Sequence, residues 1–230
     1  MAGVSDRTFA RPFCTVTKPE IIQRLLAPGI IAIIRADSAD QLLHAAEALL
    51  AGGVTAVEIT MTTPNAIPTI GDIAAKLGDQ ILMGVGSIID PETARVAILG
   101  GAEFVITPVT RPEIIRMCNR YGKPIASGAF TPTECLVAHE SGADFVKLFP
   151  ADQVGPGYIK NLLAPLPMLQ IIPTGGVNAA TASAFLQAGS VALGVGTALV
   201  SRDILAARAW KKLTARAAEL VQAVRAARLA

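Results

Sequence analysis

Aromatic and cysteine residues are scarce in this chain of 230 residues. Aromatics make up 4% of the sequence, and the cysteines are Cys14, Cys118 and Cys135. An odd number of widely separated cysteines excludes the dense disulfide framework of a small secreted protein and the paired spacing of a zinc site. We therefore expect a reducing compartment and a cytoplasmic protein.

Long apolar runs and a strong net charge are also lacking. A charge, a proline or a glycine interrupts every apolar stretch before it reaches the roughly 20 residues that a membrane helix needs. The formal net charge is +2, and the basic residues are scattered along the chain. We expect no membrane and no nucleic-acid partner, so an anionic ligand must be held by a local site.

The first 17 residues contain no apolar segment of the kind that a secretory signal needs. We expect residues 1–17 to form a loose N-terminal extension, with an organellar-targeting segment as the alternative. Residues 18–230 are expected to form one domain. The 52% hydrophobic content is enough for one large core, and barrels of strands and helices often have this length.

Short β-branched runs alternate with stretches of helical period from residue 30 onward. This pattern is typical of repeated βα units and a parallel sheet. The runs begin at intervals of roughly 20 to 26 residues, and they span residues 30–35, 56–60, 81–86, 104–107, 124–127, 144–149, 170–174 and 191–195. The sequence therefore predicts an α/β fold, a (β/α)8 TIM barrel. An open doubly wound sheet is the alternative, but no glycine-rich turn follows the first run.

Helices are predicted between and around these runs. Residues 18–26 are expected to form a short N-terminal helix that covers the N-terminal mouth of the barrel, and residues 203–228 a final helix. Capping residues mark the starts of four intervening helices, at Ser38, Asp90, Thr110 and Thr131.

The sixth run contains a lysine among aromatic residues. A period of two places Phe145, Lys147 and Phe149 on the inward face of the strand, near the end where barrel enzymes hold their active sites. A desolvated amine loses its proton more readily and can attack a ketone to form a Schiff base. The alternative is a lysine that reaches solvent or pairs with a carboxylate.

The second run places Glu58 and Thr60 on its inward face. Burial raises the pKa of a carboxyl group toward neutrality, which suits a group that shuttles protons during Schiff-base formation and C–C cleavage. An ion pair between Glu58 and Arg35 or Lys147 is the structural alternative.

Glycine-rich loops follow the seventh and eighth runs. They contain Gly175, Gly176, Gly196 and Thr197, and their exposed backbone N–H groups suit a phosphate. Two such loops on adjacent strands favour an anion site more than either loop alone, because glycine pairs also serve simple turns.

Six segments together resemble the family of 2-keto-3-deoxy-6-phosphogluconate and 4-hydroxy-2-oxoglutarate aldolases, which includes a phosphogalactonate branch. They span residues 57–60, 84–87, 106–108, 145–150, 173–177 and 194–197. The resemblance implies a class I aldolase of the Entner–Doudoroff type that releases pyruvate and an aldehyde. It also implies a homotrimer that needs no metal and no other cofactor.

The resemblance further assigns roles to residues. It implies that Lys147 forms the Schiff base and that Glu58 is the acid/base. It also implies that Ser87 contacts the substrate carboxylate, that Pro108 and Phe149 shape the pocket, and that the phosphate contacts Gly175, Gly176, Gly196 and Thr197. Beside these, we expect Thr60 and Thr174, at the ends of the second and seventh runs, to contact the substrate.

One position departs from the family pattern. Many members have an arginine four residues after the glutamate, where this chain has Thr62. Arg35, at the end of the first run, is expected to supply the missing contact, because a guanidinium binds a carboxylate or a phosphate in a bidentate manner. A salt bridge from Arg35 to Glu58 or Asp37 is the alternative. The preferred substrate among the gluconate, galactonate and hydroxyglutarate types stays open.

Two other functions stay open as well. A phosphosugar isomerase or epimerase would share the late phosphate loops, but it would need paired acid/base groups and no strand lysine. A barrel that only binds a metabolite would use Lys147 as an ion-pair partner. His44 and His139 lie in predicted outer helices, so we expect neither to be catalytic and no metal site to exist.

Overall fold

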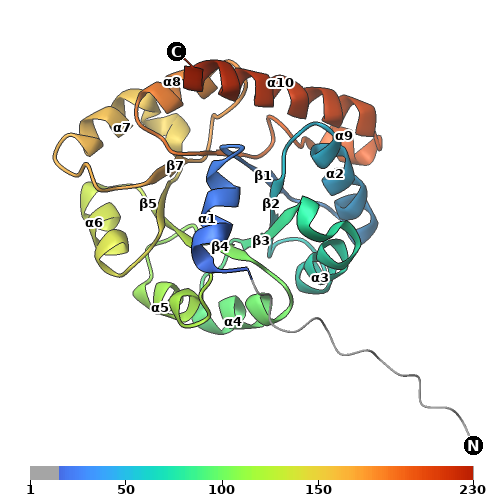
Figure 1. Cartoon of the computed structure of the whole chain (residues 1–230), viewed down its shortest axis with the longest axis horizontal. Coiled ribbons are helices and arrows are strands. Elements are labelled where there is room, and N and C mark those ends of the chain that lie inside the picture. The colour runs from blue at the N-terminus through green and yellow to red at the C-terminus, as the bar shows by residue number, and fades with distance from the viewer. Residues whose placement is uncertain (1–15, 230) are drawn as a thin grey trace, which may run out of the picture.

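Eight parallel strands form a barrel in the computed structural model, which describes residues 16–229 (Figure 1). Neighbouring strands pair in the order β7-β6-β5-β4-β3-β2-β1-β8, and a bridge between Thr174 and Gly194 joins β7 to β8. The predicted (β/α)8 barrel is confirmed. The strands are β1 (Ile30–Ile34), β2 (Ala56–Thr60), β3 (Leu82–Gly86), β4 (Phe104–Ile106), β5 (Ile125–Ala129), β6 (Phe145–Leu148), β7 (Ile171–Pro173) and β8 (Leu193–Val195).

Helices surround the barrel as an outer ring, except the first helix, which lies across one end (Figure 1). Their bounds are α1 (Lys18–Leu26), α2 (Ala39–Ala51), α3 (Ala66–Leu77), α4 (Pro91–Leu99), α5 (Pro112–Arg120), α6 (Pro132–Glu140), α7 (Gly155–Leu163), α8 (Ala182–Gln187), α9 (Arg202–Ala206) and α10 (Trp210–Leu229), with short 3-10 turns at Gly78–Gln80 and Ala151–Gln153. The last helix, α10, packs against α2 and α8, so the end of the chain closes the ring.

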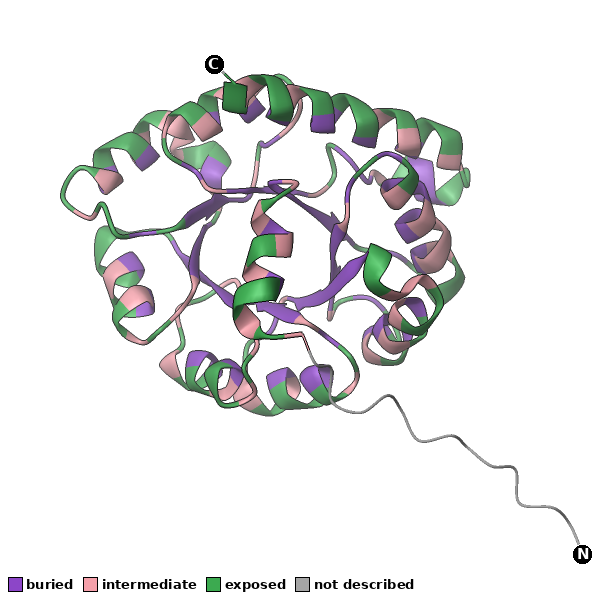
Figure 2. Cartoon of the chain, viewed as in Figure 1, coloured by how far each residue is buried: buried purple, intermediate pink, exposed green. Residues whose placement is uncertain are grey.

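The strands separate two apolar layers, as the alternation of their residues requires. Side chains that face outward pack under the helices, and those that face inward fill the lower part of the barrel. Figure 2 shows the strands buried throughout, whereas the helices are buried on their inner sides and exposed on their outer sides.

Helix α1 crosses one end of the barrel (Figure 1). Ile21 and Leu25 are 0% and 2% exposed and belong to the inner apolar cluster. The ammonium group of Lys18 lies 2.8 Å from a carboxylate oxygen of Asp144, just before β6. Helix α1 therefore covers the N-terminal mouth, as predicted, and the C-terminal mouth is left for a site.

Some local predictions were wrong. Residues 203–228 form two helices rather than one, because the chain turns at Arg208, where φ is 49°. Helix α5 begins after Arg111, and the hydroxyl of Thr110 instead donates to the carbonyl of Gly128 at 2.6 Å. Strand β5 continues to Ala129, two residues beyond its predicted end.

Some predictions concern residues outside the described part. The predicted extension, residues 1–17, lies outside it except for its last two residues, and so does Cys14. No helix within residues 16–229 is long and apolar enough to cross a bilayer.

Candidate active site

Glu58 and Lys147 both face the interior of the barrel. Their neighbours Val57, Ile59, Val146 and Leu148 belong to the outer apolar layer, so the strands turn these two charged residues inward. Glu58 is 1% exposed and Lys147 is 6% exposed. Burial of charged groups is costly without full pairing, and such groups are therefore candidates for chemistry.

The Glu58 carboxylate is poorly satisfied. Its Oε2 atom is buried and has no hydrogen-bond partner in the part of the chain that the structure describes. Burial raises the pKa of Glu58 above its ordinary value, and the positive charges of Lys147 and then Arg35 offset part of this rise. A carboxyl group in this setting exchanges protons closer to neutral pH than an exposed one.

Glycines make the space around these two groups. A side chain on Gly86 would collide with the carboxylate of Glu58, and one on Gly194 would collide with the hydroxyl of Thr174. A side chain on Gly128 would meet the backbone of Pro108. Glycines on β3, β5 and β8 thus leave room in the upper barrel for the Glu58 carboxylate, the Thr174 hydroxyl and the backbone of Pro108.

The rim of this space contains the other predicted substrate contacts. Thr60 is buried, and its hydroxyl lies 2.7 Å from the hydroxyl of Thr62. Ser87 follows β3 with φ of 60°, a left-handed conformation that is strained for a residue other than glycine. Pro108 follows β4 and is half-buried. Strained positions of this kind cluster at functional sites.

An aromatic side chain lies next to the candidate nucleophile. The Nζ atom of Lys147 lies 5.3 Å from the ring centroid of Phe149, within the range of a cation–π contact. Phe149 is 37% exposed, so it lies at the edge of the mouth rather than in the core. The structure therefore brings together Glu58, Lys147 and Phe149 as the alternation predicts.

The predicted phosphate loops follow β7 and β8 at the same mouth. Gly175 and Gly176 have φ values of 106° and 68°, which only glycine adopts without strain. Gly196 is half-buried and Thr197 is exposed. The side chain of Asp152 lies against both Gly175 and Gly176, a contact that the sequence did not indicate, because Asp152 follows another strand.

Arg35 lies at the end of β1 with an exposed side chain. The ion pairs within residues 16–229 join other side chains, so the alternative salt bridges from Arg35 to Glu58 or Asp37 are not formed. Arg35 instead lines a cavity that also contains Thr62 and Arg202. Arg202 was not among the predicted site residues.

Comparison with known proteins adds the decisive observation. A family model described as "KDPG and KHG aldolase" matches residues 21–216, which is most of the chain and includes every predicted site residue. The chain belongs to the KDPG and KHG aldolase family. The predicted family is confirmed, and with it the prediction of an aldehyde-lyase.

Named relatives of this aldolase fall into more than one branch of the family. It is 33% identical to the 2-dehydro-3-deoxy-6-phosphogalactonate aldolase of Escherichia coli K12, over 86% of this chain and 95% of that one. It is 30% identical to a 2-dehydro-3-deoxy-phosphogluconate aldolase of Haemophilus influenzae, over 91% and 99%. A solved structure described as native KDPGal is 32% identical, with a TM-score of 0.82 and coverage of 87% and 96%.

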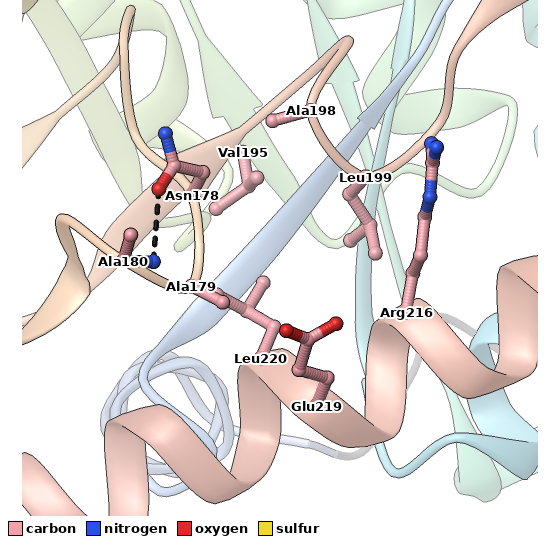
Figure 3. A pocket seen from close by; sticks show the side chains of 9 residues that line it. All are labelled: Asn178, Ala179, Ala180, Val195, Ala198, Leu199, Arg216, Glu219 and Leu220. Carbon is pink, nitrogen blue, oxygen red and sulfur yellow. Dashed lines mark hydrogen bonds between the residues drawn. The ribbon is translucent and has the colours of Figure 1, made fainter.

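A second cavity of the aldolase lies outside the mouth. It has a volume of about 310 Å³ and lies between the outward side of β8, the loop after β7 and helix α10 (Figure 3). Arg216 and Glu219 on α10 form part of its wall, and Asn178 on the loop accepts a hydrogen bond from the N–H of Ala180 at 2.9 Å. None of the predicted site residues lines this cavity.

The two histidines and the two cysteines within residues 16–229 lie in outer helices of the aldolase. The ring of His44 stacks on Trp210 with centroids 5.7 Å apart, and His139 lies on α6. Cys118 and Cys135 are fully buried. Within residues 16–229, no cluster of three or more His, Cys, Asp or Glu side chains is suited to a metal ion.

Proposed function

We propose that this aldolase cleaves 2-keto-3-deoxy-6-phosphogluconate, or a related 2-keto-4-hydroxy acid, to pyruvate and an aldehyde through a Schiff base on Lys147. The observation that carries the proposal is the burial of two charged residues, Lys147 and Glu58, on inward-facing strand positions, where the charge of Lys147 acts on the Glu58 carboxyl. A lysine amine on an inward-facing strand position can attack a substrate carbonyl to form a Schiff base.

The chemistry follows from these two groups. The Lys147 amine attacks the C2 carbonyl, and Glu58 gives the proton with which the carbinolamine loses water to form the iminium ion. The Glu58 carboxylate left by this step then removes the C4 hydroxyl proton, the C3–C4 bond breaks, and its electron pair moves into the iminium to give an enamine. The aldehyde leaves, Glu58 protonates C3, and water releases pyruvate from Lys147.

The rim residues supply the binding contacts in this proposal. Arg35, Thr60 and Ser87 offer donors to the carboxylate and hydroxyl groups of the substrate, and Pro108, Phe149 and Thr174 shape the pocket. Gly175, Gly176, Gly196 and Thr197 offer backbone N–H groups and a hydroxyl to a phosphate.

A phosphogalactonate-type substrate is the second candidate, and the 33% identity to a relative of that name favours it. The two substrates differ in configuration at C4, so kcat/KM on each, measured with the same enzyme, decides between them. Equal values would indicate an aldolase that does not discriminate at C4. If kcat/KM on one substrate is less than one tenth of that on the other, the better substrate is the assigned one.

We also propose that no metal takes part, that the active form is a homotrimer, and that the enzyme works in the cytoplasm. The iminium ion itself withdraws electrons from the breaking bond, so no metal is needed for that step. Activity that survives EDTA supports the first point. Light scattering after gel filtration tests the second, because a trimer has three times the 23.8 kDa mass of one chain.

Trapping the covalent intermediate tests the mechanism directly. The protein is incubated with pyruvate and sodium borohydride, and peptides are analysed by mass spectrometry. We expect one reduced pyruvate on Lys147 and none in Lys147→Ala. A folded protein that forms no adduct would exclude the Schiff-base mechanism and favour the isomerase, or the binding barrel if it also shows no turnover.

A further inference from the structure

Two arginines share a cavity at the C-terminal mouth. The cavity has a volume of about 320 Å³, and its wall includes Arg35, Asp37, Thr62 and Arg202. Arg35 comes directly after β1, and Arg202 is the first residue of α9, after β8. Because β1 and β8 are neighbours in the barrel, residues far apart in the sequence meet at this point.

Neither guanidinium has an anionic partner within residues 16–229. Arg24, Arg111, Arg116 and Arg208 form ion pairs with carboxylates, whereas Arg35 and Arg202 form none. Asp37 lines the same cavity but lies beyond salt-bridge distance of both. Arginine keeps its charge in proteins, so two unpaired guanidinium groups repel each other and favour an anion between them.

The cavity adjoins the candidate active site. Thr62 lines it, and the hydroxyl of Thr62 lies 2.7 Å from that of Thr60, which faces the interior of the barrel. Arg35 is also close enough to Glu58 for its charge to act on that carboxylate. A substrate bound at Lys147 can therefore extend an anionic group toward the two arginines.

We propose that Arg202 binds an anionic group of the substrate together with Arg35, and that it determines specificity for anionic substrates; this inference rests on the proposed function. Two forked donors that face one cavity suit a carboxylate or a phosphate, each of which accepts several hydrogen bonds. The planar fork of Arg202 matters as well as its charge, so lysine should replace it only in part.

A second substitution should restore the guanidinium that Arg202→Ala removes. Thr62 lines the same cavity, so an arginine at position 62 would bring a guanidinium to the space that Arg202 leaves when it is shortened. The matched control is Arg216→Ala, which removes the same charge from α10 at the outer cavity (Figure 3).

The test uses four variants of the full chain: Arg202→Ala, Arg202→Lys, Arg202→Ala with Thr62→Arg, and Arg216→Ala. Steady-state kinetics are measured with 2-keto-3-deoxy-6-phosphogluconate and its unphosphorylated analogue, together with the rate of borohydride-trapped pyruvate adduct. We expect Arg202→Ala to lower kcat/KM by about 10- to 100-fold, mainly through KM, the magnitude of a lost hydrogen bond to a charged group. Arg202→Lys and the double variant should regain part of the lost kcat/KM, and Arg216→Ala should have the kcat/KM of the parent.

The pattern of loss identifies the anion. A loss limited to the phosphorylated substrate, with unchanged pyruvate trapping, supports the inference and assigns a phosphate. Losses with both substrates and slower trapping support it and assign a carboxylate.

Two results would overturn the inference. One is an Arg202→Ala variant with parental kcat/KM on both substrates. The other is a loss of kcat and thermal stability that neither lysine nor Thr62→Arg reverses, which would make the role structural. Failure of the proposed function is seen separately, as an absence of pyruvate adduct in the unaltered protein.

Discussion

The carboxylate of Glu58 occupies the space in which a side chain of Gly86 would lie. Glu58 is on β2, and Gly86 ends the neighbouring strand β3. The position of the proposed acid/base therefore depends on a residue that takes no part in the chemistry. The φ of Gly86 is not in the left-handed region, so glycine is not required for its backbone conformation. It is required because a side chain would collide with the carboxylate of Glu58.

Gly86→Ala should displace the carboxylate of Glu58 and lower kcat by about 100-fold, the effect of an error of about 1 Å in a catalytic group. Gly157→Ala is the matched control, because nothing lies within 4 Å of a side chain added at Gly157. Steady-state kinetics and far-UV circular dichroism would be measured for both. Parental kcat in a folded Gly86→Ala protein would show that the position of Glu58 is unimportant.

The stability of the protein should depend on the titration of Glu58. Burial raises the pKa of this carboxyl in the folded state above its ordinary value of 4.5. The stability that this shift contributes is therefore fully present below pH 4.5 and is lost as the pH rises through the raised value. Glu58→Gln removes the titrating group and with it the cost of a buried charge.

The difference in Tm between Glu58→Gln and the parent should consequently increase from pH 4.5 to pH 8. Each pKa unit corresponds to about 1.4 kcal/mol, and about 1 kcal/mol changes Tm by about 2–4 °C in a chain of this size. Differential scanning fluorimetry across this range provides the measurement, with the exposed Glu140→Gln as control. A difference that does not change with pH would contradict the raised pKa.

The N-terminal helix should affect stability without affecting catalysis. Leu25 on α1 is 2% exposed at the end of the barrel opposite Lys147. Leu25→Ala should lower the free energy of unfolding by about 2–5 kcal/mol, the usual cost of such a cavity, with kcat near the parental value. Urea unfolding checks this, and Leu229→Ala, at a position 90% exposed, should change little. A large loss of kcat at a temperature where the variant is folded would link α1 to the site.

Much of the fold could be predicted because its pattern is local. The alternation in residues 56–60 and 144–149 identified which side chains face inward, and capping residues such as Thr131 marked helix starts correctly. Such features depend on residues a few positions apart, which the sequence displays directly.

The wrong predictions depend on features that the sequence pattern does not signal. Helix α9 ends with Arg208 in the left-handed conformation, and the N–H of Ala209 bonds to the carbonyl of Ile204, a C-cap that glycine usually provides. An arginine in this position gives no sequence signal. Arg202 likewise meets Arg35 only because β8 lies beside β1.

The two buried cysteines should resist alkylation in the native protein. Burial raises the pKa of Cys118 to about 12 and that of Cys135 to about 11. At pH 8 only about one Cys118 side chain in 10⁴ and one Cys135 side chain in 10³ would be the reactive thiolate, and both lie under packed helices. Iodoacetamide should therefore modify neither until the helices open, and both should react in denaturant. Peptide mass spectrometry over time measures this, with glutathione as the exposed reference. Labelling of Cys118 at the glutathione rate would mean that α5 opens freely, because a closed helix admits no reagent.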